Sequence, residues 1–215
     1  MIEAVVFDLD GILIDSEHVW DDVRQQLAEE CGGRWHDEAS RDMMGMSSPE
    51  WSRYMHDVIG LRETPEEINA EVVGRMEIVY RESLPLIPGS VEAVERLAAC
   101  WPLGLASSSN RELIDFVLDV SGLGRWFVAT VSSEEVPRGK PAPDVYLEAA
   151  RRLDVSPERC AAVEDSENGI LSAKAAGMRA IAIPNPRYPP AEDALAEADL
   201  VLESIADLSP EVLAA

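Results

Sequence analysis

Short apolar segments that alternate with helix-like segments are the feature that most constrains the fold of this 215-residue chain. The apolar segments are residues 4–7, 103–106, 127–131, 160–163, 180–183 and 200–202. Amphipathic segments with the helical period lie between the later ones, at residues 111–120, 145–153 and 169–176. Buried strands that alternate with helices are typical of a parallel sheet covered on both faces. We therefore predict an α/β fold with a Rossmann-like parallel sheet as its core.

The stretch between the first two apolar segments departs from this alternation, because it contains helix-like segments only. We expect helices at about residues 17–30, 49–59 and 65–82, separated by Gly-Gly at 32–33 and Thr-Pro at 64–65. A crossover between parallel strands needs only one helix, so roughly 70 helical residues indicate an inserted subdomain. We predict a core of residues 1–15 and 87–215, and an all-α cap of residues 16–86.

Reactive side chains follow four of the predicted strands or precede the next helix. They are Asp8, Asp10, Ser107, Ser108, Asn110, Lys140, Glu164 and Asp165. Ligands of open α/β sheets bind beyond the carboxyl ends of the strands, so we expect these side chains to gather at one edge of the sheet. Lys140 is one of only two lysines among the 18 basic residues, and it lies in this set.

Asp8 and Asp10 are separated by one residue and would repel each other in an ordinary loop. A dication would neutralise them, and carboxylates without histidine suit Mg²⁺, which also accepts phosphate oxygens. Hydroxyls, backbone N–H groups and a lysine suit a phosphoryl group. One aspartate could then attack phosphorus, while the other protonates the leaving oxygen and activates water. Each segment by itself has a simpler interpretation, as a strand-ending turn or a helix cap.

The formal net charge of -23 limits the partners that we expect. A chain this acidic is poorly suited to bind nucleic acid or anionic lipid, which both need basic patches. No apolar stretch approaches the ~20 residues of a membrane span. Three cysteines without C-x-x-C spacing favour a reducing compartment. We expect a cytoplasmic monomer or weak dimer that binds a small phosphorylated metabolite, but neither nucleic acid nor membrane.

Four motifs, "DLDGILIDS", "SSSN", "GKPAPDVY" and "EDSENGI", resemble in order those of the haloacid dehalogenase-like (HAD) hydrolase superfamily. The resemblance covers the whole chain. The helical insertion after the first motif is similar to the cap of the branch that contains β-phosphoglucomutase and small sugar-phosphate phosphatases.

The resemblance implies a role for each matched residue. Asp8 would be the nucleophile and Asp10 the general acid and base. The ligands of Mg²⁺ would be Asp8, the backbone carbonyl of Asp10 and Asp165. Glu164 would either bind the ion directly or contact one of these ligands. The phosphoryl group would contact Ser107, Ser108, Asn110 and Lys140.

Departures within the family favour hydrolysis over phosphoryl migration. The mutase branch carries a histidine in the first cap helix, and Trp20 occupies that position here. The mutase branch also has basic residues in a cap loop, whereas the matching residues 43–51 of this chain include none. We therefore predict a Mg²⁺-dependent phosphatase of a small sugar or polyol phosphate that works through an aspartyl-phosphate. The alternatives are a phosphomutase and a non-catalytic binding protein. Trp20, Met46 and Ser47 are candidate substrate contacts in the cap, although a tryptophan such as Trp20 more often belongs to the core of the cap than to a substrate site.

Overall fold

The computed structural model describes residues 1–214, and six strands in this part of the chain form one sheet. The strands are β1 (Ala4–Phe7), β2 (Leu103–Ser107), β3 (Phe127–Ser132), β4 (Cys160–Glu164), β5 (Arg179–Ala182) and β6 (Leu200–Val201). Their order is β3-β2-β1-β4-β5-β6, and every neighbouring pair is parallel. This order confirms the predicted Rossmann-like α/β fold.

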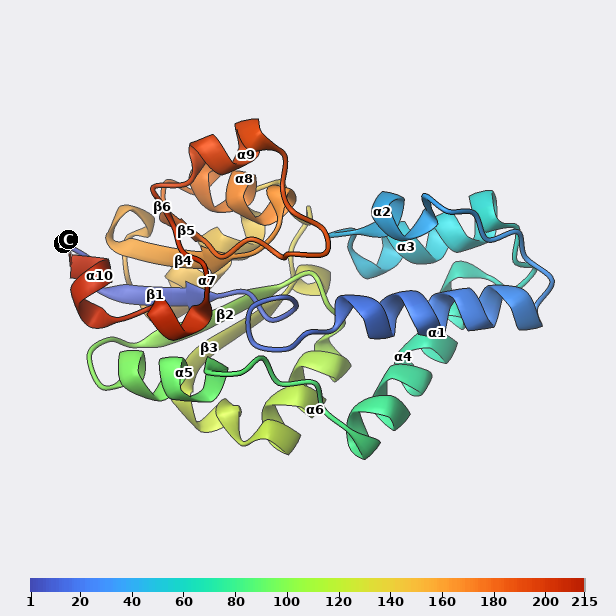
Figure 1. The fold of residues 1–215 in the computed structure, drawn as a ribbon, viewed down its shortest axis with the longest axis horizontal. Coiled ribbons are helices and arrows are strands. Elements are labelled where there is room, and N and C mark those ends of the chain that lie inside the picture. Colours follow the sequence, from blue (N-terminus) through green and yellow to red (C-terminus); the bar gives the residue numbers. More distant parts are fainter. Residues whose placement is uncertain (215) are drawn as a thin grey trace.

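Helices cover both faces of the sheet (Figure 1). The core helices are α5 (Ser90–Ala98), α6 (Arg111–Ser121), α7 (Asp144–Leu153), α8 (Glu167–Ala175), α9 (Glu192–Glu197) and α10 (Pro210–Ala214), with short 3-10 turns at Leu123–Trp126, Ser133–Glu135, Pro157–Arg159 and Ile205–Asp207. Val5 and Phe7 of β1 pack into the core formed with α5 and α6, whereas Ala4 and Val6 pack into the core formed with α7 and α8. Because both faces are buried, the strand is apolar throughout instead of alternating.

The chain between β1 and α5 forms a helical cap that extends beyond one end of the sheet (Figure 1). Its elements are α1 (Glu17–Glu30), α2 (Ala39–Met43), α3 (Ser48–Tyr54), a π-helical turn (Met55–Ile59) and α4 (Pro65–Glu82). α1 and α4 have the bounds that the sequence predicts, while the exact limits of the cap as a subdomain stay a prediction. α2 was not predicted, because five residues are too short to show a helical period.

Local capping signals fix where the cap helices begin. Thr64 accepts a hydrogen bond from the backbone N–H of Glu67, whose side chain in turn accepts one from the Thr64 backbone N–H, and Pro65 occupies the first helical position of α4. Ser47 and Glu50 form the same reciprocal pair at the start of α3. The single helix predicted for residues 49–59 is divided, because its last five residues form the π-helical turn.

The strand order places a crevice beside β1. The chain crosses from β1 to β2 and β3 on one side, and to β4, β5 and β6 on the other. The loops that follow β1 and β4 therefore diverge and leave room for a ligand at their carboxyl ends. The cap lies over this same end of the sheet (Figure 1).

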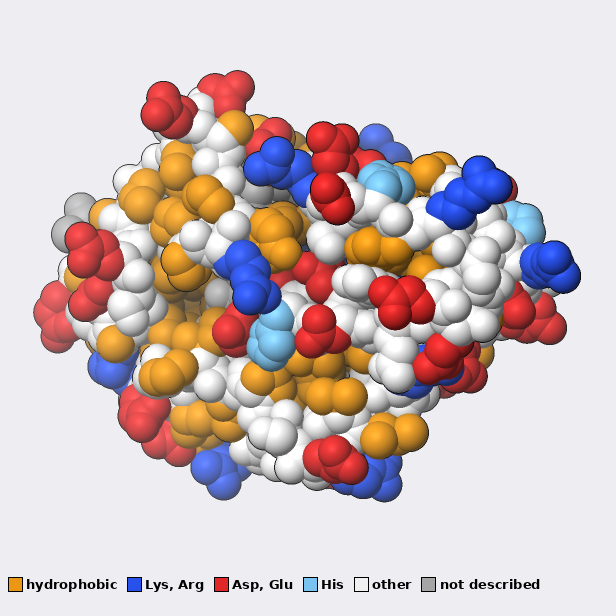
Figure 2. All heavy atoms as spheres, turned by 45° about the vertical axis from the view of Figure 1, so that its right-hand side comes forward, with side chains coloured by type: hydrophobic (Ala, Val, Ile, Leu, Met, Phe, Trp, Pro, Cys, Tyr) orange, Lys and Arg blue, Asp and Glu red, His pale blue; other side chains and the backbone are white. Residues whose placement is uncertain are grey.

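None of the helices in residues 1–214 is long and apolar enough to cross a membrane. Figure 2 shows acidic, basic and hydrophobic side chains interspersed over one face of the molecule.

Candidate active site

A buried cluster of charged side chains lies at the carboxyl ends of β1 and β4. Asp8 directly follows β1, Glu164 ends β4 and Asp165 follows it, and carboxylate oxygens of all three lie within 4.8 Å of one another. The Lys140 Nζ enters from the loop before α7 and donates to Asp8 Oδ1 at 2.9 Å, Glu164 Oε1 at 2.5 Å and the Ala106 carbonyl at 3.1 Å. The structure thus brings together four of the residues that the sequence singled out.

The charges in this cluster do not balance. Three carboxylates face the single ammonium group of Lys140. Burial raises the pKa of Asp8 and of Asp165 well above the ordinary value, and Lys140 only partly opposes this. Burial would lower the pKa of Lys140, but its contacts with Asp8 and Glu164 raise it instead. A divalent cation would remove the imbalance, so the residues present fit such an ion.

The carboxylate of Asp10 joins the cap to the core. Its Oδ1 accepts hydrogen bonds from the Ser16 hydroxyl at 2.5 Å and from the Trp20 indole N–H at 3.2 Å. Its Oδ2 accepts from the hydroxyls of Ser109 at 2.6 Å and Ser107 at 3.3 Å. Ser16 and Trp20 belong to the start of the cap and the two other serines to the end of β2, so the position of Asp10 depends on both parts.

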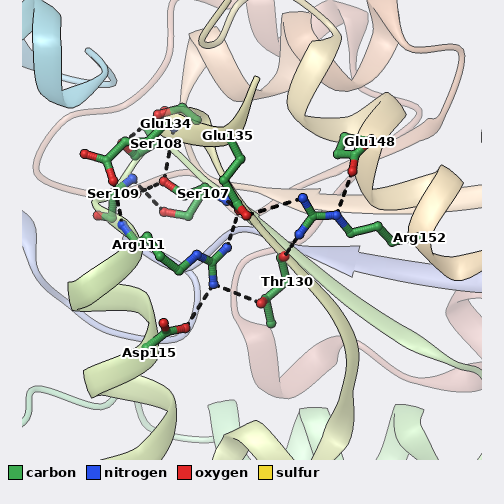
Figure 3. A network of polar contacts seen from close by, with 12 residues as sticks. Ser107, Ser108, Ser109, Arg111, Asp115, Thr130, Glu134, Glu135, Glu148 and Arg152 are labelled. Carbon is green, nitrogen blue, oxygen red and sulfur yellow. Dashed lines mark hydrogen bonds and ion pairs between the residues drawn. The ribbon is translucent and has the colours of Figure 1, made fainter. Parts of the chain in front are cut away.

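The serine loop, residues 107–110 at the end of β2, is held in place by hydrogen bonds from neighbouring elements (Figure 3). Ser132 and Ser133 donate to the carbonyls of Ser109 and Ser108, at 2.7 and 3.0 Å. Below the loop, Arg111 donates to Glu135 at 2.6 Å. The Ser108 hydroxyl is buried without a hydrogen-bond partner in residues 1–214, so it is free to donate to a ligand.

A cavity of about 50 Å³ lies between the cluster and the cap. It is lined by Asp8, Asp10, Glu17, Trp20, Arg24, Met43, Met44, Gly45, Met46, Trp51, Ser108, Ser109, Lys140, Asp165 and Ser166. Trp20 and Met46, two of the predicted cap contacts, are among these residues. Trp20 is also buried in the cap, which fits a residue of the cap core, and its contact with a substrate stays a prediction.

Four predicted site residues, Ser47, Ser107, Asn110 and Glu164, do not line the cavity, and two of them, Ser47 and Asn110, make side-chain hydrogen bonds away from it. The Ser47 hydroxyl donates to Glu50 at 2.6 Å as part of the helix cap, and Ser47 does not line the cavity. The Asn110 side-chain amide donates to Asn69 at 3.1 Å and Glu134 at 2.8 Å, so it anchors the loop and does not face the cavity. The Asn110 Oδ1 is buried without a hydrogen-bond partner in residues 1–214, and the roles of Ser47 and Asn110 as ligand contacts stay predictions.

Several residues at the site were not predicted. Ser109 lies within the quoted "SSSN" motif, so its signal was present in the sequence. Tyr146 donates to Glu164 at 2.6 Å from the first turn of α7. Glu17 and Arg24 lie two turns apart on the face of α1 that also carries Trp20, so helical spacing could have linked these three residues.

Comparisons with known proteins agree with this geometry. A model of the haloacid dehalogenase-like hydrolases matches residues 2–177. Hexitol phosphatase B of Escherichia coli is 34% identical over 234 residues, which cover 99% of this chain and 96% of that protein. A phosphorylated carbohydrates phosphatase of Thermotoga maritima is 31% identical over 182 residues, 84% of each chain. The crystal structure of CbbY from Rhodobacter sphaeroides in complex with phosphate has a TM-score of 0.85 at 28% identity, covering 97% of this chain and 96% of that one.

Fold, site and relatives together define the class as a phosphoric monoester hydrolase with a Rossmann-like core. The chain belongs to the haloacid dehalogenase-like hydrolase family.

Proposed function

We propose that this protein is a Mg²⁺-dependent phosphatase that hydrolyses a small sugar or polyol phosphate through an aspartyl-phosphate on Asp8. The observation that carries the proposal is the contact of Asp8 with Lys140, at 2.9 Å, within a buried acidic cluster at the switch point of the sheet. The relatives named as hexitol and carbohydrate phosphatases support the substrate class. The free thiols of Cys31, Cys100 and Cys160 fit a protein of the reducing cytoplasm, and we propose a monomer or weak dimer.

In the first half of the reaction, a carboxylate oxygen of Asp8 would attack phosphorus while the bond from phosphorus to the ester oxygen breaks. Asp10, in its protonated form, would give its proton to that leaving oxygen and release the alcohol. In the second half, Asp10 would take a proton from water as the water oxygen attacks phosphorus. The bond between phosphorus and Asp8 then breaks, and inorganic phosphate leaves.

The remaining residues of the site would bind and orient. Lys140 would neutralise charge on Asp8 and on the transferring group, and the hydroxyls of Ser107 and Ser108 would donate to the phosphoryl oxygens. The metal would be held by Asp8, the backbone carbonyl of Asp10 and Asp165, with Glu164 beside them. When bound, Mg²⁺ supplies the positive charge that the carboxylates and the phosphoryl oxygens require.

The mutase alternative has less support. The cap segment from Met43 to Trp51 that lines the cavity presents methionine and tryptophan side chains, and it holds no lysine or arginine to retain a second phosphate. Arg24 of α1 does line the cavity, but Glu17 and Asp10, which line it too, would oppose a second phosphate as the intermediate reorients. We propose hydrolysis as the outcome.

Phosphate release from sorbitol 6-phosphate, glucose 6-phosphate and glycerol 3-phosphate, with Mg²⁺ or with EDTA, tests the proposal. We expect metal-dependent release that falls on the order of 10³-fold in Asp8→Asn, because the nucleophile is lost. The matched control is Asp22→Asn, an exposed aspartate of α1, which should keep wild-type activity. Isomerisation of β-glucose 1-phosphate with a bisphosphate primer would favour the mutase, and no turnover in either assay would favour a binding protein.

A further inference from the structure

Arg24 is buried in the cap between two tryptophans at the edge of the cavity. Its guanidinium carbon lies 4.5 Å from the ring centre of Trp20 and 4.7 Å from that of Trp51, and the residue is 6% exposed. Such stacking orients the planar guanidinium and leaves its N–H groups at the edges of the plane. Arg24 lines the same cavity as Asp8, so its side chain borders the reaction site.

Arg24 has a buried hydrogen-bond donor that is unused within residues 1–214. Its Nε is buried without a hydrogen-bond partner in this part of the chain. Burial lowers its pKa to about 10, with Glu17 opposing the change, so the group is still a cation at neutral pH. A buried charged donor without an acceptor is costly, which indicates that a ligand supplies one.

Glu17 faces the same cavity from two turns earlier on α1. Burial raises its pKa to about 7, and the nearby charge of Asp10 adds to the rise while Arg24 opposes it. The cap thus presents one donor and one acceptor that are not paired with each other. Hydroxyl groups both donate and accept, so a hydroxylated carbon chain would satisfy both residues. A second phosphate would meet the negative charges of Glu17 and Asp10.

We propose that Arg24 and Glu17, with Arg24 held between Trp20 and Trp51, form a subsite that binds the hydroxyl groups of an uncharged polyol chain distal to the phosphate. The proposal rests on the proposed phosphatase activity and deepens it. Arg24 is then the specificity-determining residue, and Asp8 and Lys140 act only at the phosphate end.

The test compares two esters of equal chain length, sorbitol 6-phosphate and n-hexyl phosphate, which differ in their hydroxyl groups. Wild-type enzyme with Mg²⁺ should show a kcat/KM at least about 10-fold higher for sorbitol 6-phosphate. Arg24→Met keeps the apolar stacking but removes the donors, so kcat/KM for sorbitol 6-phosphate should fall about 10- to 100-fold, with less than about threefold change for hexyl phosphate. Arg24→Lys should restore part of the loss. Arg53→Met, at an exposed arginine of α3, is the matched control.

Other outcomes would overturn the proposal. Equal losses on both esters in Arg24→Met would make Arg24 a structural residue of the cap. Preference of the wild type for fructose 1,6-bisphosphate, lost in Arg24→Met, would assign the subsite to a second phosphate instead. If circular dichroism shows that Arg24→Met does not fold, Glu17→Gln replaces it in the test. Loss of the preference for sorbitol 6-phosphate in Glu17→Gln would then support the subsite, and an unchanged preference would overturn it. Failure of the wild type to release phosphate from either ester would instead overturn the proposed function.

Discussion

The ammonium group of Lys140 forms ion pairs with two buried carboxylates, those of Asp8 and Glu164. Its side chain is 3% exposed, and those of Asp8 and Glu164 are 10% and 0% exposed. Lys140→Met keeps an unbranched side chain but leaves both carboxylates without a cation. Removal of the cation leaves buried negative charge without a partner. We therefore expect the free energy of unfolding to fall by about 3–5 kcal/mol, measured by urea denaturation at pH 7 without Mg²⁺.

The other lysine of the chain provides the control for this prediction. Lys174 pairs with Asp199 at 2.8 Å, but its side chain is 31% exposed. Exposed ion pairs contribute less than about 1 kcal/mol, so Lys174→Met should change stability little. Similar losses in both variants would contradict the view that burial makes the Lys140 pairs important.

At the scale of elements, the start of α8 is packed directly against the end of β4. A Cβ atom added to Gly169 would overlap the carboxylate of Glu164. Gly169→Ala should therefore displace Glu164 or α8, and we expect the free energy of unfolding to fall by about 1–3 kcal/mol in thermal or urea denaturation. Activity should fall as well, since Glu164 contacts Lys140.

Gly74 shows the opposite case in the middle of α4. A Cβ atom there would have no neighbour within 4 Å, and the residue is exposed. Alanine in place of a helical glycine reduces the entropy lost on folding, so Gly74→Ala should stabilise the protein by about 0.5–1 kcal/mol. If the two alanine variants shifted stability in the same direction, the close packing at Gly169 would not be the cause.

At the scale of the whole molecule, we expect the cap to move when a substrate enters. The cavity beside Asp8 is small, about 50 Å³, and residues of both the cap and the core line it. A Cβ atom on Gly139 of the core would lie 3.3 Å from the Cβ of Ser47 in the cap, close to the span of a disulfide. We expect the oxidised double variant S47C/G139C to lose at least about 10-fold in turnover, because the bond holds the cap closed.

Reduction and the single variants complete this test. Dithiothreitol should restore the turnover of the double variant, and the single variants S47C and G139C should not respond to oxidation or reduction. If the cross-link forms, as shown by mass spectrometry, and turnover stays at the wild-type level, substrate enters without movement of the cap at this edge.

Much of this architecture could be predicted because its causes are local in the sequence. The helical period and the capping residues Thr64 and Pro65 predict α4, and the unbroken apolar runs predict strands covered on both faces. Asp8, Lys140 and Asp165 could be predicted to meet, because parallel strands present their carboxyl ends at one edge.

Only the tertiary structure decides how the cap completes the site. Ser47 and Asn110 lie in the right segments, but helix capping and the contact with Asn69 turn their side chains to other partners. Arg24 stands on an apolar helix face, and its position between Trp20 and Trp51 requires α1 and α3 to pack together. The sequence by itself therefore determines the fold and the phosphate end of the site, where backbone topology places the residues. Side-chain directions in the cap depend on contacts between residues far apart in the chain, and packing alone sets those.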